Sequence, residues 1–102
     1  TSRNYAMGES EKRIGIAIKE NGGWPDNFIL STKIDRNMDT LVLDKKRTRE
    51  SIEESLKTLN VNSVDVLFLH DPSGLGLNAL KTSADFETSP GILYTCGQFL
   101  CL

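Results

Sequence analysis

The chain has 102 residues, which is room for one small domain. Its formal net charge of -2 and pI near 5.3 leave no basic footprint for nucleic acid or for an anionic membrane surface. No apolar run approaches the roughly 18 to 20 residues that cross a bilayer, and residues 1–13 lack the apolar segment of a secretory signal. We therefore expect a cytoplasmic protein with no nucleic-acid or membrane partner.

The first predicted element is a helix over residues 9–20. Ile14 and Ile18 lie four residues apart on one face with Ala17 beside them, and Asn21-Gly22 is a good C-terminal stop. A glycine-rich connection leads to a predicted strand over residues 28–34, FILSTKI, which is short and rich in strand-forming residues.

A second helix and a second strand follow a polar loop. Asp44 is a plausible N-cap for a helix in which Ile52, Leu56 and Leu59 recur at i, i+4 and i+7. Residues 64–69, VDVLFL, are nearly continuous in apolar character, as in strands that are covered on both faces. The order helix, strand, helix, strand at this spacing predicts an α/β fold with parallel strands.

Both predicted strands end on ionisable side chains, Lys33 and His70, and His70 is the only histidine. In parallel α/β folds the strand ends meet at one edge, where ligands bind. Singly, such a lysine is more often a surface residue and such a histidine a structural one. Their occurrence in successive strands at one edge favours a functional site. Arg36 and Asn37 are candidates to line it, and Asp71 precedes a proline and favours a turn.

Three segments together resemble the aldo-keto reductase family: TSRNYAMGESEKRIGIAI, FILSTKI and RESIEESLKTLNVNSVDVLFLHDP. They cover about residues 1–72 in the right order and spacing. The ending HDP looks most like the aldose/lactol dehydrogenase-like branch. The family fold is an eight-stranded (β/α) TIM barrel with its active site at the C-terminal face. The resemblance thus implies a partial barrel of roughly two strands and two helices, with a divergent C-terminal tail.

The resemblance also implies catalytic residues. The family uses an Asp, a Tyr, a Lys and a His, and by motif Tyr5, Lys33 and His70 match the last three. A tyrosine before a helix is usually a packing or surface residue, so the role of Tyr5 depends on the surrounding SRNYAMGESEKRIG pattern. The aspartate would stand one residue before Thr1.

The implied activity is that of an NAD(P)-dependent oxidoreductase acting on aldehydes, ketones or aldoses, with NADP or NAD as cofactor. Carbonyl reduction leaves negative charge on oxygen, which needs a proton donor or preorganised donors. An ammonium such as that of Lys33 favours the phenolate form of a nearby tyrosine, and a neutral imidazole such as His70 can donate to the carbonyl oxygen. We assign no cofactor-binding residue, because the family holds most cofactor contacts in later strands and loops.

Composition changes directly after the HDP motif. Residues 1–72 carry 11 of the 12 Lys and Arg residues and 12 of the 14 Asp and Glu residues. We therefore divide the chain into a barrel segment, residues 1–72, and a divergent tail of uncertain structure, residues 73–102, for which alternative splicing or a shifted reading frame is our hypothesis. Cys96 and Cys101 in the tail could be free thiols, a disulfide loop or half of a metal site, and we assign no metal site.

A complete barrel takes about 250 residues, and two strands alone leave unpaired edges and exposed apolar faces. We expect a fragment or truncated product that is inactive alone and self-associates through its strand edges.

The alternative is a non-catalytic interaction protein like the potassium-channel β subunits, which depart from histidine at the HDP position. A metal-dependent hydrolase using His70 and Asp71 would lack a second histidine ligand. Tyr5, Lys33 and His70 together favour enzyme ancestry and a small carbonyl or sugar substrate.

Overall fold

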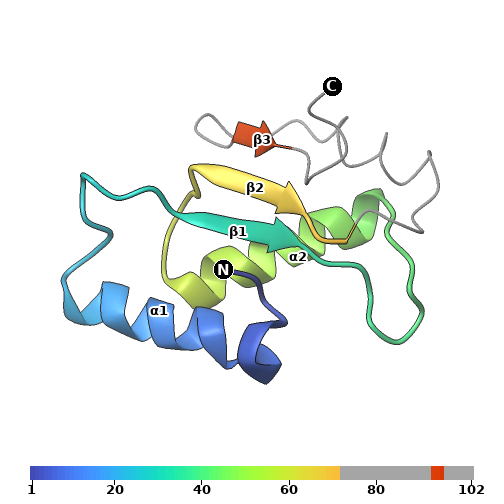
Figure 1. Cartoon of the computed structure of the whole chain (residues 1–102), viewed down its shortest axis with the longest axis horizontal. Helices are drawn as coiled ribbons and strands as arrows, with labels where there is room; N and C mark the ends of the chain where they lie inside the picture. The colour runs from blue at the N-terminus through green and yellow to red at the C-terminus, as the bar shows by residue number, and fades with distance from the viewer. Residues whose placement is uncertain (72–92, 96–102) are drawn as a thin grey trace.

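The computed structural model describes residues 1–71 and the backbone of residues 93–95 (Figure 1). In chain order the elements are a short 3-10 helix η1 (Tyr5–Gly8), α1 (Glu9–Glu20), β1 (Ser31–Ile34), α2 (Lys45–Leu59), β2 (Val66–Leu69) and β3 (Leu93–Thr95). The strands form one parallel sheet in the order β1-β2-β3. The predicted α/β fold with parallel strands is confirmed, and β3 is a short addition to the two predicted strands. Cys96 and Cys101 lie outside the described residues.

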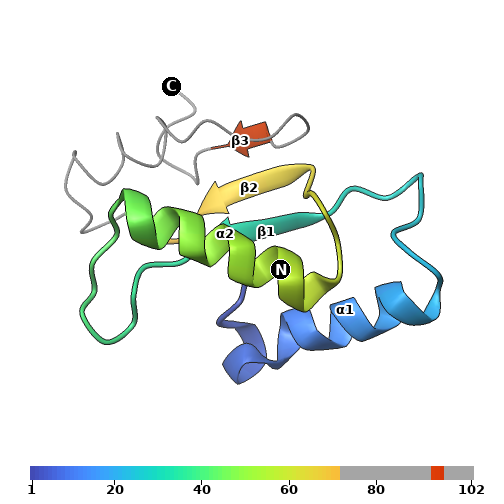
Figure 2. The same ribbon diagram turned by 180° about the vertical axis from the view of Figure 1, so that it is seen from behind.

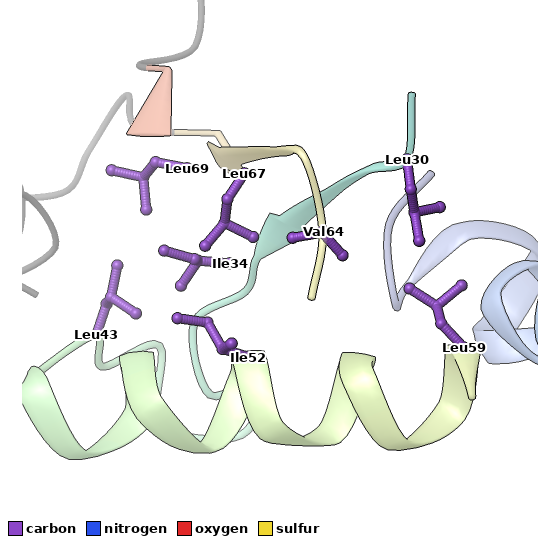
Figure 3. Packing of buried hydrophobic residues seen from close by; sticks show 8 residues of the cluster. All are labelled: Leu30, Ile34, Leu43, Ile52, Leu59, Val64, Leu67 and Leu69. Carbon is purple, nitrogen blue, oxygen red and sulfur yellow. The ribbon is translucent and has the colours of Figure 1, made fainter. Parts of the chain in front are cut away.

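The hydrophobic core lies between α2 and one face of the sheet, and α1 packs beside α2 (Figures 1 and 2). Buried and half-buried side chains alternate along β1 and β2, as the two-residue period of a strand requires. Eight buried side chains from the sheet, the loops and α2 form the core cluster (Figure 3): Leu30, Ile34, Leu43, Ile52, Leu59, Val64, Leu67 and Leu69. Lys33 and Phe68 alternate with the buried positions and so occupy the other face of the sheet.

Both helices begin and end close to where the sequence predicts. Helix α1 spans Glu9–Glu20, and Asn21 is its C-cap. The side chain of Asp44 caps α2 by accepting a hydrogen bond from the Arg47 backbone N–H at 2.7 Å. Neither helix in the described part of the chain has the length and hydropathy that a bilayer crossing needs.

The buried face of α1 is the predicted one at Ile14 and Ile18 but not at Ala17. Gly15 and Ile18 are buried, whereas Ala17 is exposed, so the prediction that placed Ala17 on the apolar face is wrong. The reason is the close approach of α2: a Cβ on Gly15 would stand 2.0 Å from the carbonyl oxygen of Thr58. Helix α1 therefore turns its smallest residue toward α2, which apolar periodicity alone does not reveal.

The strands are shorter than predicted. Phe28 and Ile29 precede β1 and are 65% and 75% exposed. The Leu30 N–H donates to the carboxylate of Asp65 at 2.7 Å, and the Leu30 carbonyl accepts from the Asp65 N–H at 2.9 Å. Because the Leu30 N–H binds the Asp65 side chain instead of a backbone carbonyl, the regular ladder begins only at Ser31 and Val66.

Candidate active site

The parallel register brings the ends of β1 and β2 to the same edge of the sheet. Ile34 pairs with Leu69 as the last pair of the ladder, and the His70 N–H donates to the Ile34 carbonyl at 3.0 Å. Asp35 and His70 are therefore the first residues after the two strands. We call this place, with the side chains of Tyr5, Lys33, Asp35 and His70, the carboxyl edge.

The three side chains predicted as a catalytic group lie close together at this edge. The Lys33 Nζ atom is 4.5 Å from the centroid of the Tyr5 ring. The Tyr5 and His70 rings meet edge to face, with centroids 5.6 Å apart and planes at 86°. The fold thus brings together one residue from η1, one from β1 and one that follows β2, while their catalytic roles stay a prediction.

Lys33 and Tyr5 are positioned by the N-terminal segment. The Lys33 ammonium donates to the Thr1 carbonyl at 2.8 Å and also faces the Tyr5 ring, an arrangement that cation–π attraction favours. Ala6 and Met7, which follow Tyr5, have φ of 52° and 55° in the left-handed region, which costs about 1–2 kcal/mol for a residue with a Cβ. This strained turn joins Tyr5 directly to the start of α1.

Two opposite charges, on Lys33 and Glu11, act on the Thr1 amino group next to this edge. Glu11 of α1 is 1% exposed, and its Oε1 accepts a hydrogen bond from the Thr32 hydroxyl at 2.5 Å. Burial, followed by the nearby Lys33 ammonium, lowers the pKa of the Thr1 amino group from its ordinary value, and the Glu11 carboxylate acts in the opposite direction. The segment before Tyr5 therefore lies between a cation and a buried anion.

Two functional candidates were missed by the sequence analysis, Asp35 and Ser2. Asp35 is 3% exposed, and its Oδ1 is hydrogen-bonded with His70 Nδ1. The Ser2 hydroxyl, 0% exposed, donates to Asp35 Oδ2 at 3.3 Å and lies 3.2 Å from His70 Nδ1. Asp35 could have been predicted from the strand register, because it follows β1 as His70 follows β2. No local pattern indicates Ser2.

A cavity of about 300 Å³ opens beside His70 and is lined by Asn4, Asp35, Arg36, Met38, Leu41, His70 and Asp71. A neighbouring hollow of about 180 Å³ shares Arg36 and includes Asn37. Arg36 is anchored by donating from Nη2 to the Asp71 carbonyl at 2.9 Å. Arg36 and Asn37 thus line hollows at the carboxyl edge, which supports the proposal that they face a substrate.

Asp71 is exposed, and its Oδ2 lies 3.8 Å from His70 Nε2. Across residues 1–71 the structure gathers no group of three or more His, Cys, Asp or Glu side chains that could hold a metal ion. His70 and Asp71 therefore have no third such ligand in the described part of the chain.

The residues at this edge fit only one part of a nicotinamide dinucleotide. A phenol, an ammonium and an imidazole can exchange protons or hydrogen bonds with a substrate at a reacting carbon–oxygen group. A pyrophosphate, in contrast, takes free backbone N–H groups at a helix N-terminus. The first turn of α1 carries Glu9 and Glu11, and Asp44 already caps α2. The two described α-helices thus present no such phosphate site.

Comparison with known proteins gives one family and several partial relatives. The model described as "Aldo/keto reductase family" matches residues 1–75. L-galactose dehydrogenase of Arabidopsis thaliana is 35% identical over 71 residues, 70% of this chain and 22% of the relative. D-threo-aldose 1-dehydrogenase of Pseudomonas sp is 31% identical over 108 residues, 82% of this chain and 32% of the relative. A probable voltage-gated potassium channel subunit beta of Arabidopsis thaliana is 37% identical over 71 residues, 67% of this chain and 22% of the relative.

The chain spans between 22% and 32% of the length of these curated relatives. The predicted resemblance is confirmed over the segment that holds Tyr5, Lys33 and His70. The parallel strands and two helices agree with the predicted partial (β/α)₈ barrel.

Proposed function

This chain belongs to the aldo/keto reductase family, and from that membership we propose that it carries part of the active site of an NAD(P)-dependent oxidoreductase acting on aldehydes, ketones or aldoses. NADP or NAD, when bound, exchanges a hydride with the substrate carbon. In that reaction the residues of this chain contact the oxygen atom of the substrate's reacting group. The composition supports a cytoplasmic location.

A single observation carries the proposal, the convergence of Tyr5, Lys33 and His70 at the carboxyl edge, where His70 lines a cavity. Their side chains come from η1, β1 and the residue after β2, and they meet only because the parallel register aligns the strand ends. Each side chain also makes structural contacts, but the three together place an ammonium, a phenol and an imidazole at one edge of the sheet. Such groupings are typical of catalytic sites.

Each side chain has a chemical role in the proposal. Tyr5 exchanges the proton of the substrate oxygen, and the Lys33 ammonium, 4.5 Å from the centroid of the Tyr5 ring, holds that ring in place. His70 lines the cavity and forms a hydrogen bond with the substrate there. Arg36 closes one side of the same cavity.

The alternative is a non-catalytic interaction protein like the potassium-channel β subunits. A relative with that name is as similar as the dehydrogenases, so identity alone does not decide between them. The grouped Tyr5, Lys33 and His70 favour the oxidoreductase, because binding a channel needs none of their proton chemistry.

We also propose that these 102 residues by themselves do not turn over substrate. The described part of the chain supplies donors for the substrate oxygen but, on its two α-helices, no phosphate site. Two described α-helices and three parallel strands leave an unpaired edge on β1, where self-association would occur.

The test is a chimera in which residues 1–71 replace the matching segment of D-threo-aldose 1-dehydrogenase. We expect nicotinamide-dependent oxidation of aldoses, followed by the absorbance of the reduced nicotinamide. Lys33→Met in the chimera should lower kcat/KM about 10²–10⁴-fold, the range for loss of a proton-transfer group. The 102-residue chain alone should show no turnover.

The matched control is Lys12→Met, which removes an exposed lysine of α1 that pairs only with Glu9 in the described structure. It should leave kcat/KM unchanged. A chimera that folds cooperatively and binds nicotinamide dinucleotide yet is inactive would contradict the proposed function and favour the interaction protein.

A further inference from the structure

The imidazole of His70 meets two oxygen atoms at the same nitrogen. Asp35 Oδ1 is hydrogen-bonded with Nδ1, and Ser2 Oγ lies 3.2 Å from it. Both partners are almost fully buried, at 3% and 0% exposure, so water does not compete for Nδ1 on this side. The position of the His70 proton is therefore decided by what these two oxygens can accept or donate.

The Ser2 hydroxyl has its single proton already in use. It donates to Asp35 Oδ2 at 3.3 Å and accepts from the Asn4 backbone N–H at 3.4 Å. A hydroxyl has one donor and two lone pairs, so the side that faces His70 is a lone pair. An ionised carboxylate only accepts. Both neighbours of Nδ1 are thus acceptors. An unprotonated Nδ1 would place its own lone pair against theirs, with no proton to form a hydrogen bond.

We infer that Asp35 is a positioning residue that holds the neutral His70 as its Nδ1–H tautomer and leaves Nε2 as a hydrogen-bond acceptor. Sequence analysis gave neutral His70 the role of donor to a carbonyl oxygen. With its one proton held by Asp35, neutral His70 has no N–H at Nε2 to donate. Fixing the tautomer through the other ring nitrogen is the general means by which carboxylates set histidine function.

Asp35 is itself held in place by α2. Its backbone N–H donates to the Ser51 hydroxyl at 2.9 Å, and its carbonyl accepts from Arg47 Nε at 3.1 Å. Ser51 is fully buried. These contacts fix the backbone of Asp35 against α2, and the Ser2 hydroxyl, bonded to Oδ2, holds the carboxylate beside His70.

The other ring nitrogen faces the open side. Nε2 lies 3.8 Å from Asp71 Oδ2, beyond hydrogen-bond distance, and makes no direct hydrogen bond within residues 1–71. The remaining charged neighbours are Lys33, over the Tyr5 ring that meets the imidazole, and Arg36, bonded to the Asp71 carbonyl. Nε2 is thus free to contact a molecule in the cavity that His70 lines.

This tautomer narrows the substrate class, a step that depends on the proposed function. An acceptor at Nε2 matches a hydroxyl group next to the reacting carbon, which aldoses and lactols carry and simple aldehydes lack. A site that binds this hydroxyl discriminates against analogues without it, because the hydrogen bond to Nε2 is then lost. His70 would recognise that hydroxyl while Tyr5 exchanges the proton of the reacting oxygen.

The decisive experiment is long-range ¹H–¹⁵N NMR of the 102-residue chain at alkaline pH, which favours a neutral imidazole in general. His70 is the only histidine, so its two ring nitrogens need no assignment against others. We expect the proton on Nδ1 in the wild type and in Asp71→Asn, which removes the other nearby carboxylate. Asp35→Asn should keep the pattern, because its amide oxygen still accepts, whereas Asp35→Ala should lose it.

A wild-type spectrum with the proton on Nε2 overturns the inference, as does the same pattern in the wild type and in Asp35→Ala. If Asp35→Ala does not fold, the wild type and Asp71→Asn still decide. This measurement needs no turnover, so its failure is distinct from failure of the proposed function. In the chimera, removal of the hydroxyl next to the reacting carbon should lower kcat/KM about 5- to 150-fold, the effect of 1–3 kcal/mol for an unpaired group. Equal kcat/KM for both substrates would overturn the substrate assignment alone.

Discussion

Two regions of this chain are held together by different interactions. Between α2 and the sheet, the contacts are apolar side chains such as Ile34, Leu59 and Leu67, each at most 1% exposed. At the carboxyl edge, the contacts are hydrogen bonds and ring contacts among polar side chains, and Tyr5 is 44% exposed. Stability should therefore depend on the first region and chemistry on the second. Substitutions can test whether the two are separable.

Leu59→Ala should give the largest loss of stability. Leu59 is fully buried at the end of α2, so its truncation leaves a cavity in the core (Figure 3). We expect the free energy of unfolding to fall by about 2–5 kcal/mol, measured by urea unfolding. Ile29→Ala is the control, because Ile29 is 75% exposed and should change stability by less than about 0.5 kcal/mol. Equal losses would mean that the core does not lie under α2.

Gly15→Ala should give the second largest loss of stability. A Cβ at Gly15 would stand 2.0 Å from the Thr58 carbonyl oxygen, so α1 and α2 must move apart. We expect about 1–3 kcal/mol of destabilisation, against the gain that alanine normally gives inside a helix. Ala17→Ser on the exposed face of α1 is the control. A stabilised Gly15→Ala variant would show that the helices are not in close contact there.

Tyr5→Phe should reduce activity without reducing stability. Its ring is half-exposed and lies at the edge rather than in the core, so loss of the hydroxyl should change the free energy of unfolding by less than about 0.5 kcal/mol. In the chimera the same change should remove most of the activity. Strong destabilisation by Tyr5→Phe would instead assign Tyr5 a structural role.

The smallest effect should come from Glu9 on the surface of α1. The side-chain hydrogen bond from Lys12, and then its charge, lower the pKa of the Glu9 carboxyl below its ordinary value of 4.5. A depressed folded pKa adds stability that is present above the unfolded value and is lost as the pH falls through the folded value. Glu9→Gln should therefore slightly reduce stability at neutral pH and remove this part of the acid dependence in urea unfolding. An unchanged acid profile would contradict the pairing with Lys12.

Local signals predicted much of the fold. The Asp44 cap and the Asn21-Gly22 stop depend on neighbouring residues alone, and the structure places both helices accordingly. The burial of Gly15 in place of Ala17 was not predictable in this way, because it depends on where α2 lies. The start of β1 was missed for a similar reason, since the Asp65 side chain binds the Leu30 backbone from another part of the chain.

The candidate site was predicted in the residues that a motif marks and missed in those that only the fold brings in. Tyr5, Lys33 and His70 stand in recognisable segments, and the structure brings them together. Ser2 lies within the first of these segments and Asp35 directly follows the second, but neither was assigned a role from its motif. Their importance arises from burial and from the register that sets Asp35 beside His70.

The most direct test of the carboxyl edge as one assembled site is a nuclear Overhauser measurement between the rings of Tyr5 and His70. Their edge-to-face contact at 5.6 Å between centroids predicts cross-peaks between the ring protons of the two residues, and Tyr5→Phe distinguishes Tyr5 from the other tyrosine, Tyr94. The structure predicts these cross-peaks together with contacts of Leu59 in the core. Core contacts without any Tyr5–His70 cross-peak would show a folded chain whose predicted catalytic residues do not meet.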